Sequence, residues 1–384
     1  MPGSRPDFHR MDILSGLSRC AAAAPHGPLM NRPPAAPAAT RLDIGIIPGE
    51  GIGPELTGHC RHLLELLAAR HQWDLSFAEC GPVGLEARKN LGADLPDTAA
   101  GFVADVLGRG GAVLAGAGGG RFVFDLRRRF RLDWKLNPIR RLRGAGTHPC
   151  PFDILILRDN REGLYQGMEE AFEDTEGPGV RHAFTTRLAT TRALAHRAAR
   201  LAASRRGHLT IVAKESGIPG PSRLWRQAGE EAAAAHGVTL EVLEVDFAAY
   251  QLVRCPEAFD VITVPNAFGD ILADLGGLLM GSRGNTFGAS FNPDGLGVFQ
   301  TNHGAAYDLA GRGTANPAGQ ILATALMLRS AFGQHRAADA LEHAVQEAWC
   351  AGCRTADMLP AAPRPCSTGD FVRKVAEFLE DSRA

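Results

Sequence analysis

The chain of 384 residues lacks several features that would assign it to a class at once. It has no run of about 18 uninterrupted apolar residues, so we expect no membrane-spanning helix. Its net charge is only −1, which gives no overall field to attract nucleic acid or a membrane surface. Of its eight cysteines, only Cys350 and Cys353 form a CxxC pair, and no second pair completes a zinc ribbon. We therefore expect reduced thiols in a cytoplasmic protein.

The first forty residues lack the pattern of a folded segment. The stretch AAAAPHGPLMNRPPAAPAAT is rich in alanine and proline, and proline prevents regular backbone pairing. It also lacks the clean apolar core of a signal peptide. We expect residues 1–40 to be a disordered extension. An upstream start codon, with Met30 as the true start, would explain it, and a targeting role is the alternative.

From residue 41 onwards, apolar strands alternate with helical segments. LDIGII (42–47) is nearly all apolar, as a buried parallel strand would be, and a helical stripe of leucines follows it. The order recurs with GAVLAGAG, FDILILRD, HLTIVAKES, VTLEVLEVD and AFDVITVPN, and the last third of the chain is predicted to be helical. This alternation predicts an α/β protein with a largely parallel central sheet.

Two glycine-rich segments lie where a ligand could bind. GEGIG (49–53) follows a strand and opens a helix, as in a dinucleotide-binding fingerprint, but its glycines have the wrong spacing. A tight turn with a close backbone approach is the alternative. Residues 290–317 are rich in Gly, Asn and Asp, and we predict a long loop there, which is usually functional.

Two carboxylates interrupt the apolar segment NAFGDILADLGGLLMG (266–281). Asp270 and Asp274 are four residues apart and share one face of a helix, where like charges repel and burial is costly. A helix cap at Asp270 and a solvated Asp274 would explain them without a ligand. A divalent cation would also explain them, with Asp246 at the end of an apolar strand as a third oxygen ligand.

Five segments occur in an order that is typical of one family: GIIPGEGIGPE, LRDNREGLYQGMEE, VAKES, VDFAAYQLVRCPEAFDVITVPNAFGDILADLGG and HGAAYDLAGRGTANP. Over about residues 42–329 the chain resembles the β-decarboxylating dehydrogenases, which act on isopropylmalate, isocitrate, homoisocitrate and tartrate. The resemblance implies oxidation of a 2-hydroxy acid with NAD(P) and Mg²⁺ or Mn²⁺, followed by loss of the β-carboxylate.

The resemblance also implies an isopropylmalate-dehydrogenase-like two-domain fold. Residues 41–140 and 281–384 would form the large, cofactor-binding domain, and residues 141–280 the small domain with the dimer interface. The expected partners are a small-molecule substrate and a second copy of the chain, in a homodimer with shared active sites. No nucleic acid and no membrane is expected.

Each matching residue gains an implied role in the chemistry. Asp270 and Asp274 of one subunit and Asp246 of the other would bind the metal. Lys214 in VAKES would transfer the proton of the substrate hydroxyl, because a neighbouring dication lowers the pKa of a lysine and favours its neutral form. Tyr165 in EGLYQG would protonate the enol carbon after decarboxylation. Without the resemblance, Lys214 would be a surface lysine at a strand end.

Substrate and cofactor residues follow in the same way. Arg127 and Arg158 match arginines that bind substrate carboxylates, whereas a surface ion pair with Asp159 or Glu162 is the alternative for Arg158. The adenosine half of NAD would be held by His303, Gly304, Ala305, Ala306, Asp308 and Asn316. The carboxylate of Asp308 would accept the ribose hydroxyls and repel a 2′-phosphate, which favours NAD over NADP.

The substrate turn departs from the family pattern. Asn137 stands where relatives carry a second arginine, and we expect Lys135 and Arg140 to leave the backbone in other directions. Gln300 removes a charge near the nicotinamide, and Tyr307 replaces a proline. The basic residues near this turn suit an extra carboxylate, a phosphonate or a phosphate, or else form a solvated helix face: Arg127, Arg128, Arg129, Arg131, Lys135 and Arg140.

We therefore predict a metal-dependent, NAD-linked oxidation and decarboxylation of a substituted malate-type 2-hydroxy acid, with altered substrate recognition. One alternative is a non-decarboxylating NAD-dependent dehydrogenase of a phosphorylated or phosphonate-bearing alcohol in secondary metabolism. The other is a non-catalytic regulatory homologue. Release of CO₂ separates the first two hypotheses, and absence of NAD binding would favour the third.

Overall fold

The computed structural model describes residues 41–381, and residues 1–40 and 382–384 lie outside the described part. The predicted disordered extension and the alternative start at Met30 therefore fall on residues that are not described. Between residues 41 and 381, no helix combines the length and the hydrophobicity that crossing a bilayer requires.

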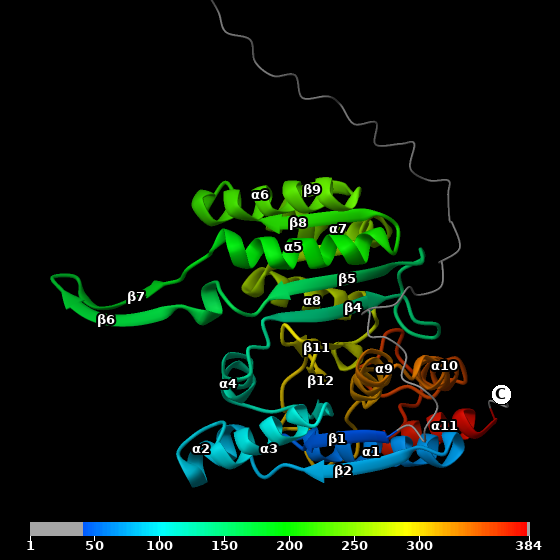
Figure 1. Cartoon of the computed structure of the whole chain (residues 1–384). Coiled ribbons are helices and arrows are strands. Elements are labelled where there is room, and N and C mark those ends of the chain that lie inside the picture. The colour runs from blue at the N-terminus through cyan, green and yellow to red at the C-terminus, as the bar shows by residue number, and fades with distance from the viewer. Residues whose placement is uncertain (1–40, 382–384) are drawn as a thin grey trace, which may run out of the picture.

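One ten-stranded sheet runs through the molecule. Its strands are β1 (Arg41–Ile47), β2 (Asp74–Glu79), β3 (Ala112–Ala115), β4 (Trp134–Arg140), β5 (Asp153–Asp159), β8 (His208–Ala213), β9 (Thr239–Glu244), β10 (Val261–Pro265), β11 (Phe287–Phe291) and β12 (Gly297–Thr301). They lie in the order β2-β1-β3-β12-β11-β4-β5-β10-β8-β9 (Figure 1). The pairs β12–β11, β11–β4 and β4–β5 are antiparallel, and the other neighbours are parallel. The prediction of a largely parallel sheet is confirmed.

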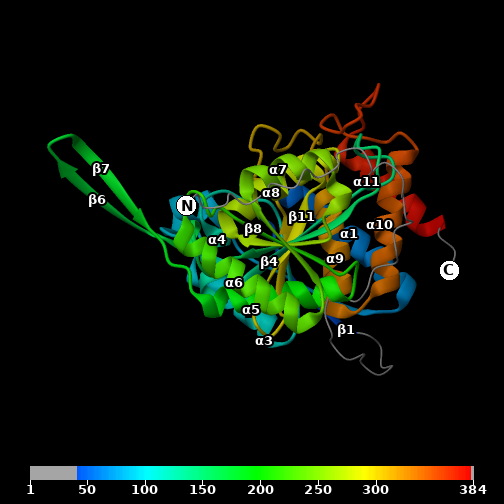
Figure 2. The same cartoon turned by 90° about the horizontal axis from the view of Figure 1, so that it is seen from above.

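Helices cover both faces of this sheet. They are α1 (Gly53–His71), α2 (Gly84–Leu91), α3 (Asp97–Gly108), α4 (Phe122–Arg129), α5 (Leu188–Ala203), α6 (Pro219–His236), α7 (Val245–Arg254), α8 (Asn266–Leu279), α9 (Ala318–Phe332), α10 (His335–Cys350) and α11 (Thr368–Asp381). Figure 2 shows α5 and α6 on one face of β8 and α7 and α8 on the other. α9 packs against β11, β12 and β3 and carries α10 on its outer side.

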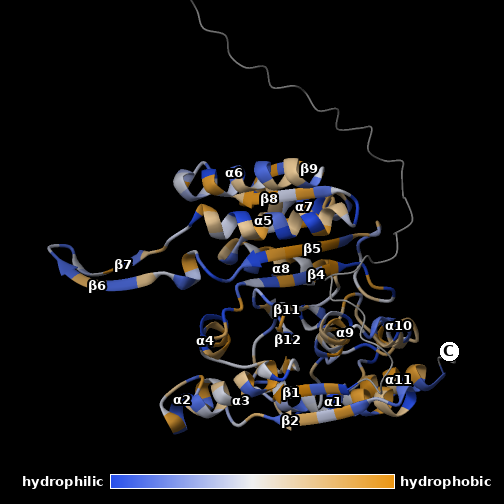
Figure 3. Ribbon diagram, in the orientation of Figure 1, coloured by the Kyte–Doolittle hydropathy of each residue, from blue (hydrophilic) through white to orange (hydrophobic). Residues whose placement is uncertain are grey.

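The core follows from the hydrophobic pattern of the strands. In β5 the run Ile154 to Leu157 is buried without a break, because both faces of the strand are covered, and β1 is buried from Leu42 to Ile47. Figure 3 shows the hydrophobic residues concentrated along such central strands. α9 is buried on all sides from Ala318 to Arg329, which fits a helix between the sheet and an outer helix layer.

The predicted loop at 290–317 is wrong for its first third. β11 and β12 pair as an antiparallel hairpin, and the turn between them is closed by a hydrogen bond from the N–H of Leu296 to the Asn292 side chain at 2.9 Å. Two short apolar runs on either side of Asn-Pro-Asp-Gly are a hairpin signal that outweighs the glycine content. The remaining residues, 302–317, do form a loop. The division into two domains stays a prediction.

A two-stranded arm extends away from the rest of the molecule (Figure 1). β6 (Met168–Asp174) pairs only with β7 (Gly177–Ala183), and their side chains are almost all exposed. This hairpin was not predicted from the sequence. It follows η1 (Leu164–Gln166), a 3₁₀ turn at the edge of the candidate site.

Candidate active site

The carboxylate helix α8 starts directly after β10 and carries Asp270 to the end of the neighbouring strand β5. Arg158, near the end of β5, forms an ion pair with Asp270 in which Nη1 and Oδ1 are 2.8 Å apart. The Tyr165 hydroxyl donates a hydrogen bond to Oδ2 of the same carboxylate at 3.1 Å. Three predicted site residues therefore meet at the carboxyl ends of parallel strands, where ligands bind in open α/β sheets.

Two asparagines hold Arg158 in place. Its Nε and Nη2 donate to Oδ1 of Asn266 at 3.2 and 2.7 Å, and Nδ2 of Asn266 donates to Oδ1 of Asn160 at 3.1 Å. A side chain at Gly269 would meet Cδ of Arg158 at 3.1 Å, so a glycine is needed where the arginine crosses the helix. Arg158 is buried, and the alternative of a surface ion pair with Asp159 is wrong. The asparagines were not predicted, because hydrogen-bond geometry leaves no pattern in the sequence.

The alternative of a helix cap at Asp270 is also wrong. α8 begins at Asn266 after Pro265, so Asp270 lies one turn inside the helix. Burial opposes ionisation of this carboxyl, but Arg158 first and then Lys135 lower its pKa below the ordinary value. Asp274 is half exposed and forms an ion pair with Arg283 at 2.9 Å. Both aspartates therefore carry oxygen ligands on one accessible face.

A second group of predicted residues lies at the ends of β8 and β9. Nζ of Lys214 is 2.8 Å from a carboxylate oxygen of Glu244 and 2.9 Å from one of Asp246. The hydrogen bonds that Lys214 donates to Glu244 and then to Asp246 raise its pKa, which is the opposite of the direction expected beside a dication. Within residues 41–381, no hydrogen bond or ion pair joins this group to Asp270.

Only part of the basic cluster points into the site. Arg127 and Lys135 are buried near Arg158, whose charge acts on the pKa of both. Arg140 pairs instead with Glu342 at 2.7 Å. The solvated helix face is confirmed for Arg128 and Arg129, which are exposed and lie near Asp125 and Asp97. Arg131, beyond the end of α4, is also exposed and lies near Asp133. Sequence alone could not separate them, because all are basic and close together.

The glycine turn at 49–53 supports the predicted cofactor loop and has the geometry of a tight turn. The N–H of Ile52 donates to the carbonyl oxygen of Ala305 at 2.9 Å. Gly51 has a φ of +59°, and a Cβ there would collide with that carbonyl oxygen. The close backbone approach is confirmed, and Ala306, with φ of +42°, makes the sharp bend that follows.

Glu50 fixes the same loop from its other side. The buried carboxylate accepts backbone hydrogen bonds from Leu85, Glu86 and Gly119 at 3.0, 2.6 and 2.9 Å, and one from the Tyr307 hydroxyl at 3.0 Å. Burial opposes ionisation, but these donors lower the pKa of Glu50. The tyrosine that replaces a proline thus anchors the loop by a bond that proline cannot make.

Replacing Tyr307 by phenylalanine should weaken NAD binding without unfolding the protein. The variant loses one hydrogen bond to a charged acceptor, and we expect the Kd of NAD measured by calorimetry to rise about three- to tenfold. The Glu50→Gln variant and the double variant complete a mutant cycle, in which the two effects should not add. Additive effects, or an unchanged Kd in Tyr307→Phe, would refute the anchoring role.

The remaining predicted cofactor residues differ in how far they are exposed. Asp308 is exposed, and His303 and Gly304 are partly or fully exposed. Asn316 is buried: its amide donates to Asn285 at 2.9 Å, and its carbonyl accepts from the N–H of Ala318 at the start of α9. The Asn316 side chain therefore fixes the end of the loop.

The family model of isocitrate/isopropylmalate dehydrogenases matches residues 43–375 of this chain. The chain belongs to this family. It is 35% identical over 358 residues to the 3-isopropylmalate dehydrogenase of Shouchella clausii (87% of this chain, 96% of the relative). To that of Colwellia psychrerythraea it is 36% identical over 367 residues (87% and 99%). The crystal structure of isocitrate dehydrogenase from Methylococcus capsulatus superposes with a TM-score of 0.80 at 28% identity, covering 88% of this chain and all of that one.

Membership of the family confirms the predicted fold and the prediction of an oxidoreductase that acts on a CH–OH group. Dehydrogenases of this family generally use NAD(P) with Mg²⁺ or Mn²⁺. The residues present fit a hard dication, because Asp270 and Asp274 offer half-exposed carboxylate oxygens from successive turns of α8. No third His, Cys, Asp or Glu of the same chain completes this pair among residues 41–381.

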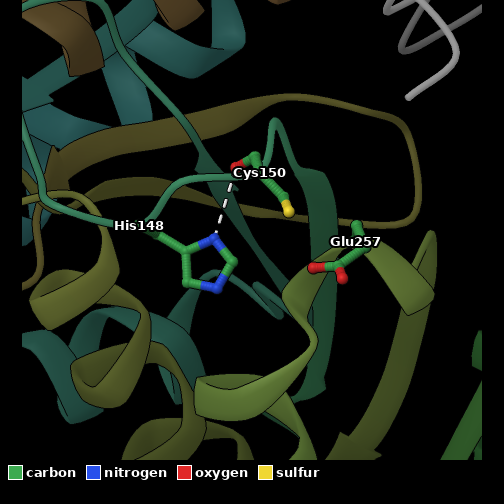
Figure 4. A group of neighbouring side chains, drawn as sticks. All are labelled: His148, Cys150 and Glu257. Carbon is green, nitrogen blue, oxygen red and sulfur yellow. Dashed lines mark hydrogen bonds between the residues drawn. The ribbon is translucent and has the colours of Figure 1, made fainter. Parts of the chain in front are cut away.

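A different group of potential ligands lies at the opposite end of the β4–β5 hairpin. The ligand atoms of His148, Cys150 and Glu257 all lie within 4.8 Å of one another (Figure 4). Nδ1 of His148 is 3.3 Å from the carbonyl oxygen of Cys150. A mixed N, S, O set of this kind favours zinc over magnesium, so the group serves below as a control for metal-binding experiments.

A buried carboxyl beside the site predicts a pH effect on stability. Burial raises the pKa of Asp159, ordinarily 3.8, to about 7, although the N–H groups of Arg161 and Glu162 donate to it. The folded state therefore holds this proton more tightly than the unfolded state. The stabilisation is complete below the unfolded pKa and is lost as pH rises towards 7, at about 1.4 kcal/mol per pH unit.

Urea unfolding at pH 5, 6 and 7 tests this assignment. As pH rises, the unfolding free energy of the unchanged protein should fall relative to that of Asp159→Asn. Asparagine keeps the hydrogen-bond acceptor and cannot ionise, so the variant does not lose this stabilisation. A difference that is constant with pH would contradict the raised pKa. A matched control, Asp153→Asn, removes a carboxyl from the other end of the same strand.

Proposed function

We propose that this enzyme oxidises and decarboxylates a substituted malate with NAD and Mg²⁺ or Mn²⁺. The observation that carries the proposal is that Arg158, an anion-binding cation, and Tyr165, a proton donor, both contact the half-exposed carboxylate of Asp270, which offers oxygen ligands. Such a set can bind a substrate carboxylate, exchange a proton at carbon and hold a hard cation. The relatives named above are 3-isopropylmalate and isocitrate dehydrogenases, which supports a substrate of the malate type.

Asp270 and Asp274 of one subunit, together with Asp246 of the partner subunit, would hold the metal. The bound cation would lower the pKa of the substrate hydroxyl and stabilise negative charge on its oxygen. Lys214 of the partner subunit would take the hydroxyl proton, and NAD would accept the hydride. Burial and then Asp270 raise the pKa of Tyr165, so its hydroxyl keeps a proton to give to the carbon that loses CO₂.

A homodimer is supported by the exposed apolar face beside the aspartates. α8 exposes Ile271 and Leu278, and α7 exposes Phe247, Tyr250 and Val253, although both helices otherwise pack on the sheet. In one chain this face of α8 is open. A second copy packed on it would cover the apolar residues and bring its own α7, which carries Asp246, towards the first copy's α8.

NAD, as opposed to NADP, is supported by the exposed carboxylate of Asp308 in a loop held by Glu50 and Tyr307. The same assignment predicts that NADP binds more weakly than NAD. A cytoplasmic location stays a prediction.

A screen of 2-hydroxy acids for NADH formation in the presence of Mn²⁺ tests the function. Malate, tartrate, isocitrate and 3-isopropylmalate are the first substrates, and CO₂ release is measured in parallel. NADH with equimolar CO₂ supports the proposal, and NADH without CO₂ supports the non-decarboxylating alternative. Failure to bind NAD by calorimetry in the presence of Mn²⁺ would support a non-catalytic homologue.

A further inference from the structure

β4 places a lysine directly opposite an arginine in the middle of the sheet. Lys135 pairs in register with Arg158 of β5, and the two side chains are only 3% and 1% exposed. Like charges opposite each other destabilise a sheet, and burying either without a counter-charge is costly. Arg158 is compensated by Asp270, but the side chain of Lys135 makes no hydrogen bond or ion pair within residues 41–381.

A third buried cation lies beside this pair. Arg127 on α4 is 6% exposed, and its guanidinium lies 5.2 Å from the ring centroid of Phe124 without an acidic partner in the described chain. Burial and then Arg158 lower the pKa of both Lys135 and Arg127. Three buried cations thus face two carboxylates, Asp270 and Asp274, and Asp274 is also paired with Arg283. The cluster has an excess of positive charge that an anionic ligand would balance.

Asn137, the residue at the position of the missing arginine, is not available to bind that anion. Its Nδ2 donates to Oδ1 of Asn302 at 3.0 Å and to the carbonyl oxygen of Phe287 at 3.3 Å. Asn302 in turn donates to the same carbonyl at 3.0 Å. Asn137 and Asn302 therefore form one neutral, hydrogen-bonded pair that occupies the space at this position.

Lys135 and Asn137 lie on the same face of β4, because they are two residues apart. A Cβ at Gly288 of β11 would lie 2.6 Å from Nδ2 of Asn137 and 3.2 Å from Cε of Lys135. The glycine leaves room for both side chains. The expectation that Lys135 leaves the backbone in another direction from Asn137 is therefore wrong.

We propose that Lys135 binds the second carboxylate of a dianionic 2-hydroxy acid, in place of the arginine that is absent at position 137. This assignment rests on the proposed function and names the residue of this chain that would select a dianionic over a monocarboxylic hydroxy acid. The ammonium group of Lys135 would contact the carboxylate that leaves as CO₂. In the transition state of decarboxylation the negative charge moves from that carboxylate into the rest of the substrate, so the contact stabilises the bound substrate more than the transition state. Lys135 therefore determines affinity and selectivity more than the rate of the chemical step.

Binding of malate and of lactate, measured by calorimetry with Mg²⁺, tests the assignment without requiring turnover. The unchanged protein should bind malate at least about tenfold more tightly than lactate, as expected for one charge-assisted contact. In Lys135→Met the ratio should fall to about threefold or less, while Asn137→Ala, on the same face of the same strand, should keep it. An undiminished ratio in Lys135→Met, or no preference for malate in the unchanged protein, would overturn the proposal.

A second measurement separates a binding role from a structural one. Methionine removes a buried, unpaired charge at similar volume, so the melting temperature of Lys135→Met should stay the same or rise. A fall of several degrees would show that Lys135 stabilises the fold and would overturn the assignment. With any acid that yields NADH, the variant should raise KM with kcat within about threefold of the original. If no acid yields NADH, the proposed function fails, and the binding ratio still decides the role of Lys135.

Discussion

Replacing Lys214 by alanine is expected to reduce kcat for NADH formation by about 10²- to 10⁴-fold, the usual contribution of a positioned acid–base group. The lysine lies just beyond β8, and its ammonium group forms ion pairs with Glu244 and Asp246, both outside the core, so its removal leaves the core untouched. The Kd of NAD should therefore stay within about twofold, since no cofactor contact is assigned to this residue.

The control for this prediction is another lysine of the chain. Lys89 at the end of α2 is exposed, and Lys89→Ala should leave kcat unchanged. Retention of more than a tenth of the original kcat in Lys214→Ala would show that another group takes the hydroxyl proton. A loss of NAD binding in that variant would instead indicate a structural role.

Replacing Asp270 by asparagine is expected to affect two properties at once. The variant removes a proposed metal ligand and the counter-charge of buried Arg158, while it keeps an acceptor for the Tyr165 hydroxyl. We expect the affinity for Mn²⁺ to fall at least about tenfold and kcat/KM at least about a hundredfold, because both the cation and the substrate carboxylate depend on this position.

Two matched variants assign the effect of Asp270→Asn. Asp274→Asn should weaken Mn²⁺ binding similarly but leave the Arg158–Tyr165 cluster intact, because its ion-pair partner is the exposed Arg283. His148→Ala disrupts the separate His–Cys–Glu group and should leave Mn²⁺ binding unchanged. If His148→Ala abolishes Mn²⁺ binding and Asp270→Asn does not, the metal assignment is wrong.

The parts of the fold that were predictable are those that the hydrophobic pattern determines. β5, β8, β10 and α8 were predicted because long apolar runs end at clear turn residues. β4 was not predicted, because WKLNPIR mixes charged residues and a proline with apolar ones. Its place between β11 and β5 is set by tertiary pairing, and its Lys135 and Asn137 side chains are buried instead of facing solvent.

The same reasoning explains which site residues could be predicted. Arg158, Tyr165 and Asp270 occur in motifs with fixed spacing, and the structure brings them together. The direction of Lys135 depends on the register of β4, and the pairing of Asn137 with Asn302 joins residues 165 positions apart in the chain. Neither relation leaves a local pattern in the sequence, so neither could be predicted without the three-dimensional structure.

The β6–β7 arm has a consequence for experiments on single chains. A hairpin that packs against no other layer of its own chain is marginally stable in water, and its amide hydrogens are protected only by the one ladder between its strands. In dilute solution the amides of Met168–Asp174 should exchange with deuterium much faster than those of β5. If these amides exchange more slowly at higher protein concentration, contact with a second chain protects the arm, and its exchange rate then reports on assembly.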